Sequence, residues 1–158
     1  MNYKLDPEAL IPQYQLDQFQ ELIGKLFQCC QERIQYQSER FGLPDAELRC
    51  LKLFESERYL TAKGIAHRMN VVKSRVTKII DGMVRKGMVQ RVKDPEDSRI
   101  TLLSLTSKGQ AKLDAINDFL SDVHQEVLNR LVPEQRTIML SNLEVLKTAM
   151  QSVKDMMT

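Results

Sequence analysis

The sequence predicts a mainly α-helical fold with one small antiparallel β-hairpin, and three observations support this. Apolar residues recur at helical spacing along most of the chain. Two short extended runs, Met88–Lys93 and Ile100–Leu105, flank a hexapeptide of turn-forming residues, Asp94–Arg99. Two helical patterns come directly before that hairpin, with a short interruption between them. Helix, turn, helix and a hairpin wing in this order are typical of a winged helix-turn-helix.

The length of 158 residues indicates a single domain. A chain of this size can bury about 70% of its unfolded surface, which is enough for an ordinary core. The start of the chain contains no apolar run that resembles a secretion signal. No stretch approaches the ~20 consecutive apolar residues of a membrane span. We therefore expect a soluble, cytoplasmic protein.

The first helix is expected from Leu16 to about Arg40, and Phe41–Pro44 should end it. Its apolar face consists of Phe19, Leu22, Ile23, Leu26, Phe27, Cys30 and Ile34. A second helix is expected to begin at Asp45, with this residue as its N-cap. The residues that this second helix should bury are Leu48, Leu51 and Phe54.

The next two helices form the predicted helix-turn-helix. Thr61–Met69 fits a short helix, and residues 70–72 interrupt it. The inward-facing positions of this helix are Ile65, Ala66 and Met69. A further helix begins at Lys73 and stops at Gly87, a residue type that commonly follows a helix. Its apolar stripe is Val76, Ile79, Ile80 and Met83. A rotation of about 100° per residue places on the other side Ser74, Lys78, Asp81 and Arg85, flanked by Arg75 and Thr77.

Two more helices follow the hairpin. Thr106 is a suitable N-cap for a helix to about Leu131, and residues 132–134 break the pattern before a final helix. The apolar positions are Leu113, Ile116, Leu120, Val123, Val127, Leu128, Ile138, Met139, Leu143, Leu146, Met150 and Val153. This is more apolar surface than a helix-turn-helix of this size can cover alone. The terminal helices either fold back onto the same core or form a twofold dimer interface.

Positive charge is concentrated in the predicted winged helix-turn-helix. Residues 61–99 contain ten Lys and Arg against four Asp and Glu, a local net charge of +6. The rest of the chain holds 13 against 17, a net charge of −4, so the total of +2 hides a basic module. Such a local field favours binding to nucleic acid phosphates. The alternative is a solvated basic face without a partner.

Residues 61–109 resemble the DNA-binding core of the multiple antibiotic resistance regulator (MarR) family. The strongest part is the D-P-x-D-x-R turn at residues 94–99 followed by L-T-x-K-G at residues 105–109. The residues that form the turn and those that cap the next helix occur there at fixed spacing in the sequence. The other matching stretches are Leu60-Thr61, Ile65-Ala66, residues 76–81 and residues 86–91. Helices on both sides extend the resemblance over nearly all of the chain.

The resemblance implies a homodimeric, sequence-specific DNA-binding transcriptional regulator, a repressor that a small ligand or an oxidant releases from a palindromic double-stranded operator. Residues 1–158 would form a single domain of this kind. Within it, residues 45–105 would be the DNA-binding lobe, and residues 1–44 and 106–158 the helical dimerisation lobe. The helix from Lys73 would lie in the major groove, and an arginine of the wing would lie in the minor groove.

The residues expected at the DNA are on that helix and on the wing. Arg75 is the leading candidate for base readout, because an arginine can fork onto guanine, whereas a lysine is more often a point charge for phosphate. Arg99 resembles the family's minor-groove arginine, and Asp97 would orient its guanidinium group. The alternative for this pair is an ordinary surface ion pair. The other residues expected near bases or phosphates are Lys73, Ser74, Thr77, Lys78, Arg85, Arg91 and Lys93.

Two residues depart from the family pattern. Val72 stands where the family usually has a Ser or Asp as N-cap, so we expect Asn70 to cap the helix or the helix to begin closer to Ser74. Gly82 lies in the middle of the helix, where a glycine costs ~1 kcal/mol relative to alanine. This cost is expected unless a neighbouring backbone or a phosphate approaches closely there.

The effector is harder to predict. The resemblance suggests a small aromatic or phenolic compound, but no residue identifies its pocket. Cys30 and Cys50 fit buried positions, whereas Cys29 lies at the edge of the apolar face with Lys25 and Arg33 one turn away on either side. Two cations so close favour a thiolate, so Cys29 is a possible redox sensor; the alternative is an inert boundary cysteine.

Neither catalysis nor a bound cofactor is expected. His67 and His124 form no ligand set with the cysteines at zinc-finger spacing, so we expect no metal site. The sequence has no glycine-rich phosphate loop and no nucleophile elbow, which argues against an enzyme. The rival interpretation is a winged-helix module that binds a protein instead of DNA. It predicts an acidic or apolar exposed face on the helix from Lys73.

Overall fold

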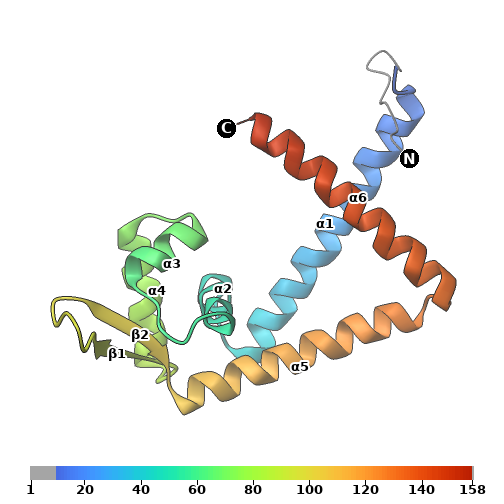
Figure 1. Ribbon diagram of the computed structural model, residues 1–158. Helices are drawn as coiled ribbons and strands as arrows, with labels where there is room; N and C mark the ends of the chain where they lie inside the picture. Colours follow the sequence, from blue (N-terminus) through green and yellow to red (C-terminus); the bar gives the residue numbers. More distant parts are fainter. Residues whose placement is uncertain (1–9, 158) are drawn as a thin grey trace. The chain divides into compact units, whose positions relative to one another are not determined.

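The computed structural model describes residues 10–157 and consists mainly of helices with one two-stranded antiparallel sheet, which confirms the predicted fold class (Figure 1). The elements in chain order are α1 (Gln13–Phe41), α2 (Asp45–Lys52), the short 3-10 helix η1 (Leu53–Glu55), α3 (Ala62–Met69), α4 (Lys73–Arg85), β1 (Val89–Lys93), β2 (Thr101–Leu105), α5 (Ser107–Asn129) and α6 (Pro133–Met156). The first residues of the predicted dimerisation lobe, 1–9, lie outside the described residues, as does residue 158.

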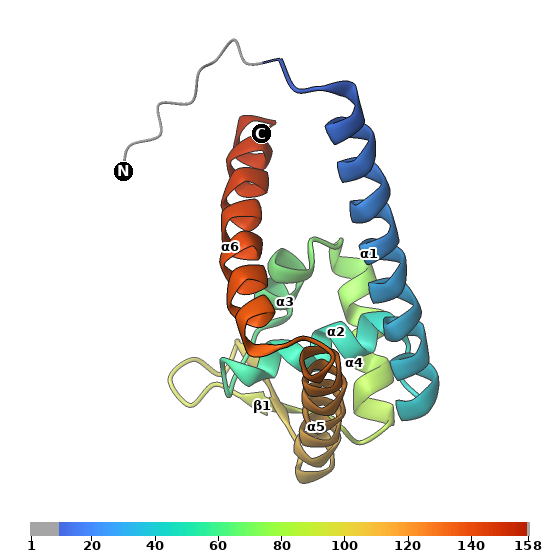
Figure 2. The ribbon, with the colours of Figure 1, turned by 90° about the vertical axis from the view of Figure 1, so that its right-hand side faces the viewer.

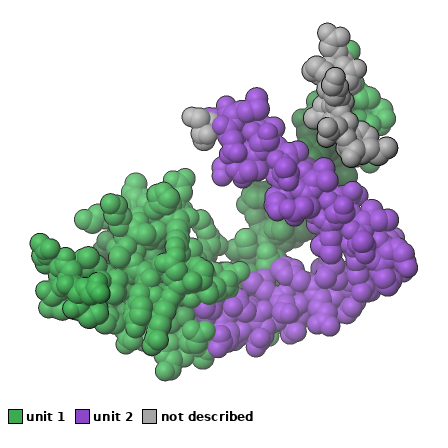
Figure 3. Space-filling view, in the orientation of Figure 1, with its two compact units in different colours: residues 1–112 green, residues 113–158 purple. Residues whose placement is uncertain are grey.

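The chain divides into two compact units, residues 1–112 and residues 113–158 (Figure 3). The first unit contains α1 to α4, both strands and the first turns of α5. The second contains the rest of α5 and all of α6. The predicted winged helix-turn-helix therefore lies entirely within the first unit.

Helix α1 begins three residues earlier than expected and ends where the sequence indicates. Gly42 adopts the left-handed conformation, with φ of 64°, and its N–H donates to the carbonyl oxygen of Glu39 at 3.3 Å. Most of the apolar face of α1 is exposed: Phe19 and Leu26 are 45% and 57% accessible. The single chain therefore leaves this face without full cover.

Helix α2 differs from the prediction at its start. Pro44, in extended conformation, is the N-cap, and its carbonyl oxygen accepts the N–H groups of Glu47 and Leu48 at 2.9 and 3.0 Å. The prediction of Asp45 as N-cap is therefore wrong. Because proline fixes its own φ and ends the preceding segment, the helix begins one residue earlier, and Asp45 lies in its acidic first turn. The three residues predicted to be buried, Leu48, Leu51 and Phe54, are buried.

Helices α3 and α4 pack on each other and on α2 and form the predicted helix-turn-helix. The hydroxyl oxygen of Thr61 accepts the N–H of Gly64 at 3.1 Å and caps α3. Asn70 ends α3 in the left-handed conformation, with φ of 52°, and produces the sharp turn into α4. The buried residues are those of the predicted stripes, Ile65, Met69, Val76, Ile79, Ile80 and Met83, while Ala66 is half-buried.

The two strands form the wing, and each begins one residue later than expected. Val89 pairs with Leu105 at the base of the hairpin and Lys93 pairs with Thr101 near its tip. Leu60, just before α3, adds a bridge to the wing: its N–H donates to the carbonyl oxygen of Leu103 at 3.0 Å and its own carbonyl oxygen accepts the N–H of Leu103 at 2.7 Å. The wing is thereby joined to the helix-turn-helix by backbone hydrogen bonds.

Helix α5 begins at the predicted cap, because the hydroxyl oxygen of Thr106 accepts the N–H of Gly109 at 3.0 Å. It ends at Asn129, two residues before the expected Leu131. The guanidinium group of Arg136 binds the carbonyl oxygens of Leu128 and Leu131 at 2.8 and 2.9 Å and thus satisfies acceptors that the helix end leaves free.

Residues 130–132 join α5 to α6, as Figure 2 shows. Helix α6 starts with Pro133 at its first position, so the predicted break lies where it was expected. Several apolar side chains of α6 are exposed, namely Ile138, Leu143, Met150 and Val153. Within residues 10–157, no helix is both long and apolar enough to cross a membrane.

Candidate nucleic-acid interface

The outer face of α4 is polar and mainly cationic, and Asp81 is the one acidic residue on this helix. The inner face is fully buried: Val76 is 1% and Met83 0% accessible. The outer face contains the predicted contact residues Lys73, Ser74, Arg75, Thr77, Lys78 and Arg85, all exposed. The first turn of α4 contains no acidic residue. A helix that buries one face and presents cations on the other can approach a polyanion without losing its packing.

The N-terminus of α4 differs from the expectation. Val72 is the N-cap and makes no side-chain hydrogen bond, and the helix begins at Lys73. Asn70 does not cap it, because this residue adopts the left-handed conformation that ends α3. No side chain therefore competes for the first N–H groups of α4, and a helix end with free N–H groups and a positive dipole favours an anion.

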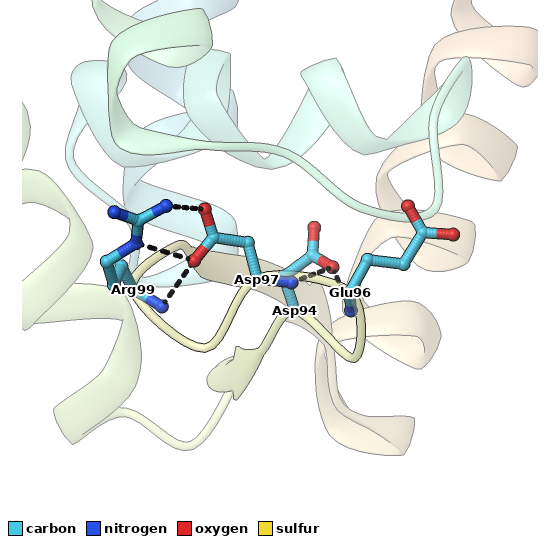
Figure 4. A network of polar contacts seen from close by, with 4 residues as sticks. All are labelled: Asp94, Glu96, Asp97 and Arg99. Carbon is cyan, nitrogen blue, oxygen red and sulfur yellow. Dashed lines mark hydrogen bonds and ion pairs between the residues drawn. The ribbon is translucent and has the colours of Figure 1, made fainter.

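Asp97 and Arg99 form a bidentate ion pair at the tip of the wing (Figure 4). Nε of Arg99 lies 2.9 Å from Oδ1 of Asp97, and Nη2 lies 2.9 Å from Oδ2. The backbone N–H of Arg99 also donates to Oδ1, at 3.1 Å. The side chain of Arg99 is 88% accessible despite these bonds. Asp97 therefore fixes the direction of a guanidinium group that remains open to a ligand.

The turn itself is organised by a second carboxylate. Oδ1 of Asp94 accepts the N–H of Glu96 at 2.8 Å (Figure 4). The N–H of Asp94 donates to the carbonyl oxygen of Ile100 at 3.1 Å. Hydrogen bonds from Arg99 hold the pKa of Asp97 below its ordinary value, and Asp97 raises the pKa of Arg99. Both groups are consequently charged at neutral pH.

Arg91 and Lys93 lie on β1, and only one of them faces solvent without an ion pair. Lys93 is exposed. Arg91 forms an ion pair with Asp81, on the outer side of α4. Sequence reasoning assigned phosphate contacts to both residues but missed this contact between the wing and α4. The opposite charges of Asp81 and Arg91 were visible, but the nine residues between them give no indication of their distance in space.

The cysteines are arranged differently from the prediction. Cys50 is buried, as expected, and burial together with the nearby Glu47 carboxylate raises the pKa of its thiol to about 12. Cys30 is exposed, so its predicted burial is wrong: the apolar face of α1 is not covered at this point. Cys29 is also exposed. The ammonium group of Lys25, one turn before Cys29, is bound to Glu21, which weakens its effect on a thiolate.

The remaining candidate groups are the two histidines and Gly82. His67 and His124 are both exposed. Among the described residues, no group of three or more His, Cys, Asp or Glu side chains could hold a metal ion. At Gly82 a group does approach closely. It is the Glu47 carboxylate rather than a backbone or a phosphate.

Comparison with known proteins agrees with this geometry. Residues 43–101 match the model of the MarR family. The chain is 24% identical to the uncharacterized HTH-type transcriptional regulator YdgJ of Bacillus subtilis over 141 residues, or 89% of this chain and 80% of that protein. It is 32% identical to the HTH-type transcriptional repressor MdtR of Bacillus subtilis over 91 residues, or 58% of this chain and 59% of that repressor.

The fold also matches solved structures. The Staphylococcus aureus MepR–DNA complex aligns with a TM-score of 0.69 at 19% identity, over 83% of this chain and 98% of that one. At this identity the likeness concerns the fold alone. It extends beyond residues 43–101 to the helices on either side of the winged helix-turn-helix.

Proposed function

Because this chain belongs to the MarR family of DNA-binding transcriptional regulators, we propose that it acts as a homodimeric repressor that recognises a palindromic operator. The observation that supports this most directly is that one module carries both the cationic outer face of α4 and, at the wing tip, the guanidinium group of Arg99. Two cationic elements on one rigid module suit adjacent grooves of a duplex. Regulation by binding requires no catalytic chemistry, so we propose no enzymatic activity.

Helix α4 is the element for the major groove. Arg75 reads bases, since its guanidinium group can bind O6 and N7 of a guanine in a bidentate manner. Ser74 and Thr77 lie near the base edges. Lys73, Lys78 and Arg85 contact phosphates and position the helix. The N-terminus of α4, which no side chain caps, supports a phosphate contact as well.

The wing is the element for the minor groove. Arg99 enters the groove, where its charge is attracted by the negative potential, while Asp97 holds its orientation. Lys93 contacts a backbone phosphate. Arg91 can do the same only if it exchanges Asp81 for a phosphate or binds both. An acidic or apolar α4 surface, which a protein-binding module would require, is not present on the outer face of this helix.

Dimerisation is supported by the apolar side chains that the single chain leaves exposed. They occur on α1, where Leu22 is 53% accessible, and on α6, where Val145 is 68% accessible. In the proposed dimer, residues 1–44 and 106–158 form the dimerisation lobe and residues 45–105 bind DNA. Closed twofold symmetry then presents two α4 helices to two half-sites.

The proposal includes repression and its release by an effector. The relative MdtR is named a repressor, which supports repression rather than activation by this chain. We propose that a small aromatic or phenolic compound releases the DNA. A cavity of about 240 Å³ beside α4 and the wing is large enough for a single ring. Its lining consists of Ala62, Thr77, Ile80, Arg91, Thr101 and Leu103. An oxidant acting on the exposed Cys29 is the second route.

The decisive experiment selects bound sequences from a pool of random DNA duplexes. We expect a palindrome whose half-site centres lie about 10 bp, or a multiple of 10 bp, apart. The affinity of the selected duplex should fall with salt at a log–log slope of ~0.9 per neutralised phosphate. Absence of binding to any duplex in dilute buffer would refute the proposal, and enrichment of a site without twofold symmetry would refute the dimer.

A further inference from the structure

Gly82 lies in the middle of α4, a position where a helix gains nothing from glycine. The residue is buried and has helical neighbours on both sides. It faces α2, the helix that packs against α4 from behind. The contact at Gly82 is therefore between α4, the candidate recognition helix, and α2, the helix that packs against it.

The group opposite Gly82 is the carboxylate of Glu47, in the first turn of α2. A Cβ atom on residue 82 would lie 2.4 Å from Oε1 of Glu47 and 3.4 Å from its Cδ. The first distance is far below van der Waals contact. An alanine fits at residue 82 only if the Glu47 carboxylate moves or if α4 moves away from α2.

Two features oppose movement of the carboxylate. The Glu47 side chain is only 10% accessible, and its Oε2 is bound by the ammonium group of Lys86 at the C-terminal end of α4. Displacement would leave a buried charge without its partner. The backbone of Lys86 is held in place, because its N–H donates to the carbonyl oxygen of Gly82 at 3.1 Å and its carbonyl oxygen accepts Nζ of Lys108 at 2.7 Å.

Cys50 is a buried neighbour of Glu47 on the same helix. It lies one turn after Glu47 on α2 and is 1% accessible. The charge of Glu47 contributes to the raised pKa of its thiol. The Glu47 carboxylate is thus enclosed by α2 on one side and by Gly82 and Lys86 of α4 on the other.

We propose that Glu47 is a positioning residue for DNA recognition: its carboxylate, in contact with Gly82 and paired with Lys86, sets the depth at which α4 packs on α2. This proposal rests on the proposed function, since it concerns how the base-reading residues are presented. A bidentate contact such as that of Arg75 tolerates little displacement, whereas long lysine side chains can follow a phosphate.

The first test is a double-mutant cycle read by thermal unfolding, which is independent of DNA. In the Glu47→Ala background, Gly82→Ala should raise the melting temperature by roughly 2–4 °C, as helix propensity predicts for an unhindered site. In the wild-type background the same change should lower the melting temperature. An equal effect of Gly82→Ala in both backgrounds would overturn the proposed contact.

The second test measures binding to the duplex selected from the random pool and to a random duplex of equal length. Gly82→Ala should weaken binding to the selected duplex about tenfold, within the range of one lost bidentate base contact, and leave the random duplex within twofold. Gly82→Ala/Glu47→Ala should bind the selected duplex within threefold of Glu47→Ala alone. Lys86→Arg should retain more of the affinity than Lys86→Met.

The outcomes separate the two proposals. If wild-type protein binds no duplex, the proposed function fails, while the unfolding cycle still tests the Glu47–Gly82 contact. If wild-type protein binds but Gly82→Ala binds the selected duplex equally well, the positioning role fails. A loss of affinity that is equal for the selected and the random duplex would also overturn it, because general destabilisation has that effect.

Discussion

The carbonyl oxygen of Met88 lies so close to Gly109 that a Cβ atom on residue 109 would be 2.0 Å away from it. The same oxygen accepts the N–H of Thr106 at 3.0 Å. The residue before β1 and the first turn of α5 are therefore in direct backbone contact. A backbone carbonyl cannot rotate away as a side chain can, so the position excludes any side chain.

Gly109→Ala should therefore destabilise the protein by ~1–3 kcal/mol, the usual cost of overpacking a filled site. Gly24→Ala is the matched control, because no atom lies within 4 Å of a Cβ there and the helix should gain ~1 kcal/mol. Urea unfolding of the two variants measures both effects. Equal midpoints for Gly109→Ala and wild type would contradict the close contact.

Arg99→Ala should weaken binding to the selected duplex roughly 5- to 150-fold at physiological salt. Its side chain is 88% accessible, so the melting temperature should not change. Asp97→Asn should have a smaller effect, because it removes the orienting partner but leaves the guanidinium group. A titration that gives the same affinity for Arg99→Ala and wild type would remove Arg99 from the interface.

Substitutions of Arg75 and of Lys78 should affect DNA binding in different ways. Arg75→Ala should relax sequence preference at one position of each half-site, because a base contact is lost. Lys78→Ala should weaken binding to all duplexes alike and reduce the salt slope by ~0.9 per half-site. Competition assays with single-base variants of the selected duplex, repeated at several salt concentrations, separate the two. The assignment is wrong if the two variants show the same pattern.

Val72→Ser should stabilise the protein by ~0.5–2 kcal/mol, since α4 has no side-chain cap and serine can accept one of its free N–H groups. Val72 is 69% accessible, so little apolar burial is lost. Val72→Ala controls for removal of the valine and should give no such gain. Thermal unfolding is the measurement, and equal melting temperatures for the two variants would show that the end of α4 is satisfied in another way.

The cysteines should react unequally with iodoacetamide. At pH 8 the exposed Cys29, at the edge of the apolar face of α1, should be alkylated in the folded protein, whereas Cys50 should be protected by its burial and by a thiol pKa of about 12. This pKa is raised above the ordinary 9.0. Between these two pH values the Cys50 thiol therefore keeps its proton in the folded state and loses it in the unfolded state. The contribution of the Cys50 thiol to the free energy of unfolding is thus fully present below pH 9 and decreases as the pH rises toward 12.

Peptide mapping after alkylation checks the first part of that prediction. Unfolding measured between pH 8 and pH 11 checks the second, with Cys50→Ala as the variant that should lose the alkaline dependence. Rapid alkylation of Cys50 in the folded chain would contradict its burial.

Patterns with a strict period or a fixed turn chemistry were predictable from sequence. The stripe through Val76 and Met83 follows helical spacing. Thr106 caps α5 through its hydroxyl group, and Gly87, which has no side chain, adopts the positive φ that stops α4. The bidentate geometry of Asp97 and Arg99 follows from two residues that are close in sequence. Local chemistry alone is sufficient in all these cases.

Contacts between distant residues were not predictable. The pair of Glu47 and Lys86 and the pair of Asp81 and Arg91 depend on the angles between packed elements, which the sequence pattern does not contain. Gly82 did give a signal, since a glycine inside a helix indicates a close neighbour, but the signal did not identify the neighbour. Cys30 was misplaced because an apolar helix face can remain uncovered in a single chain.

The paired hydrogen bonds between Leu60 and Leu103 have a consequence for kinetics. They couple the segment that leads into α3 to the second strand of the wing, so the hairpin cannot tilt without pulling on the helices beside it. In the proposed complex with DNA, engagement of one groove is then transmitted to the other through main-chain atoms. Each subunit should accordingly leave a duplex in one concerted event, and stopped-flow dissociation of a single half-site should follow one exponential.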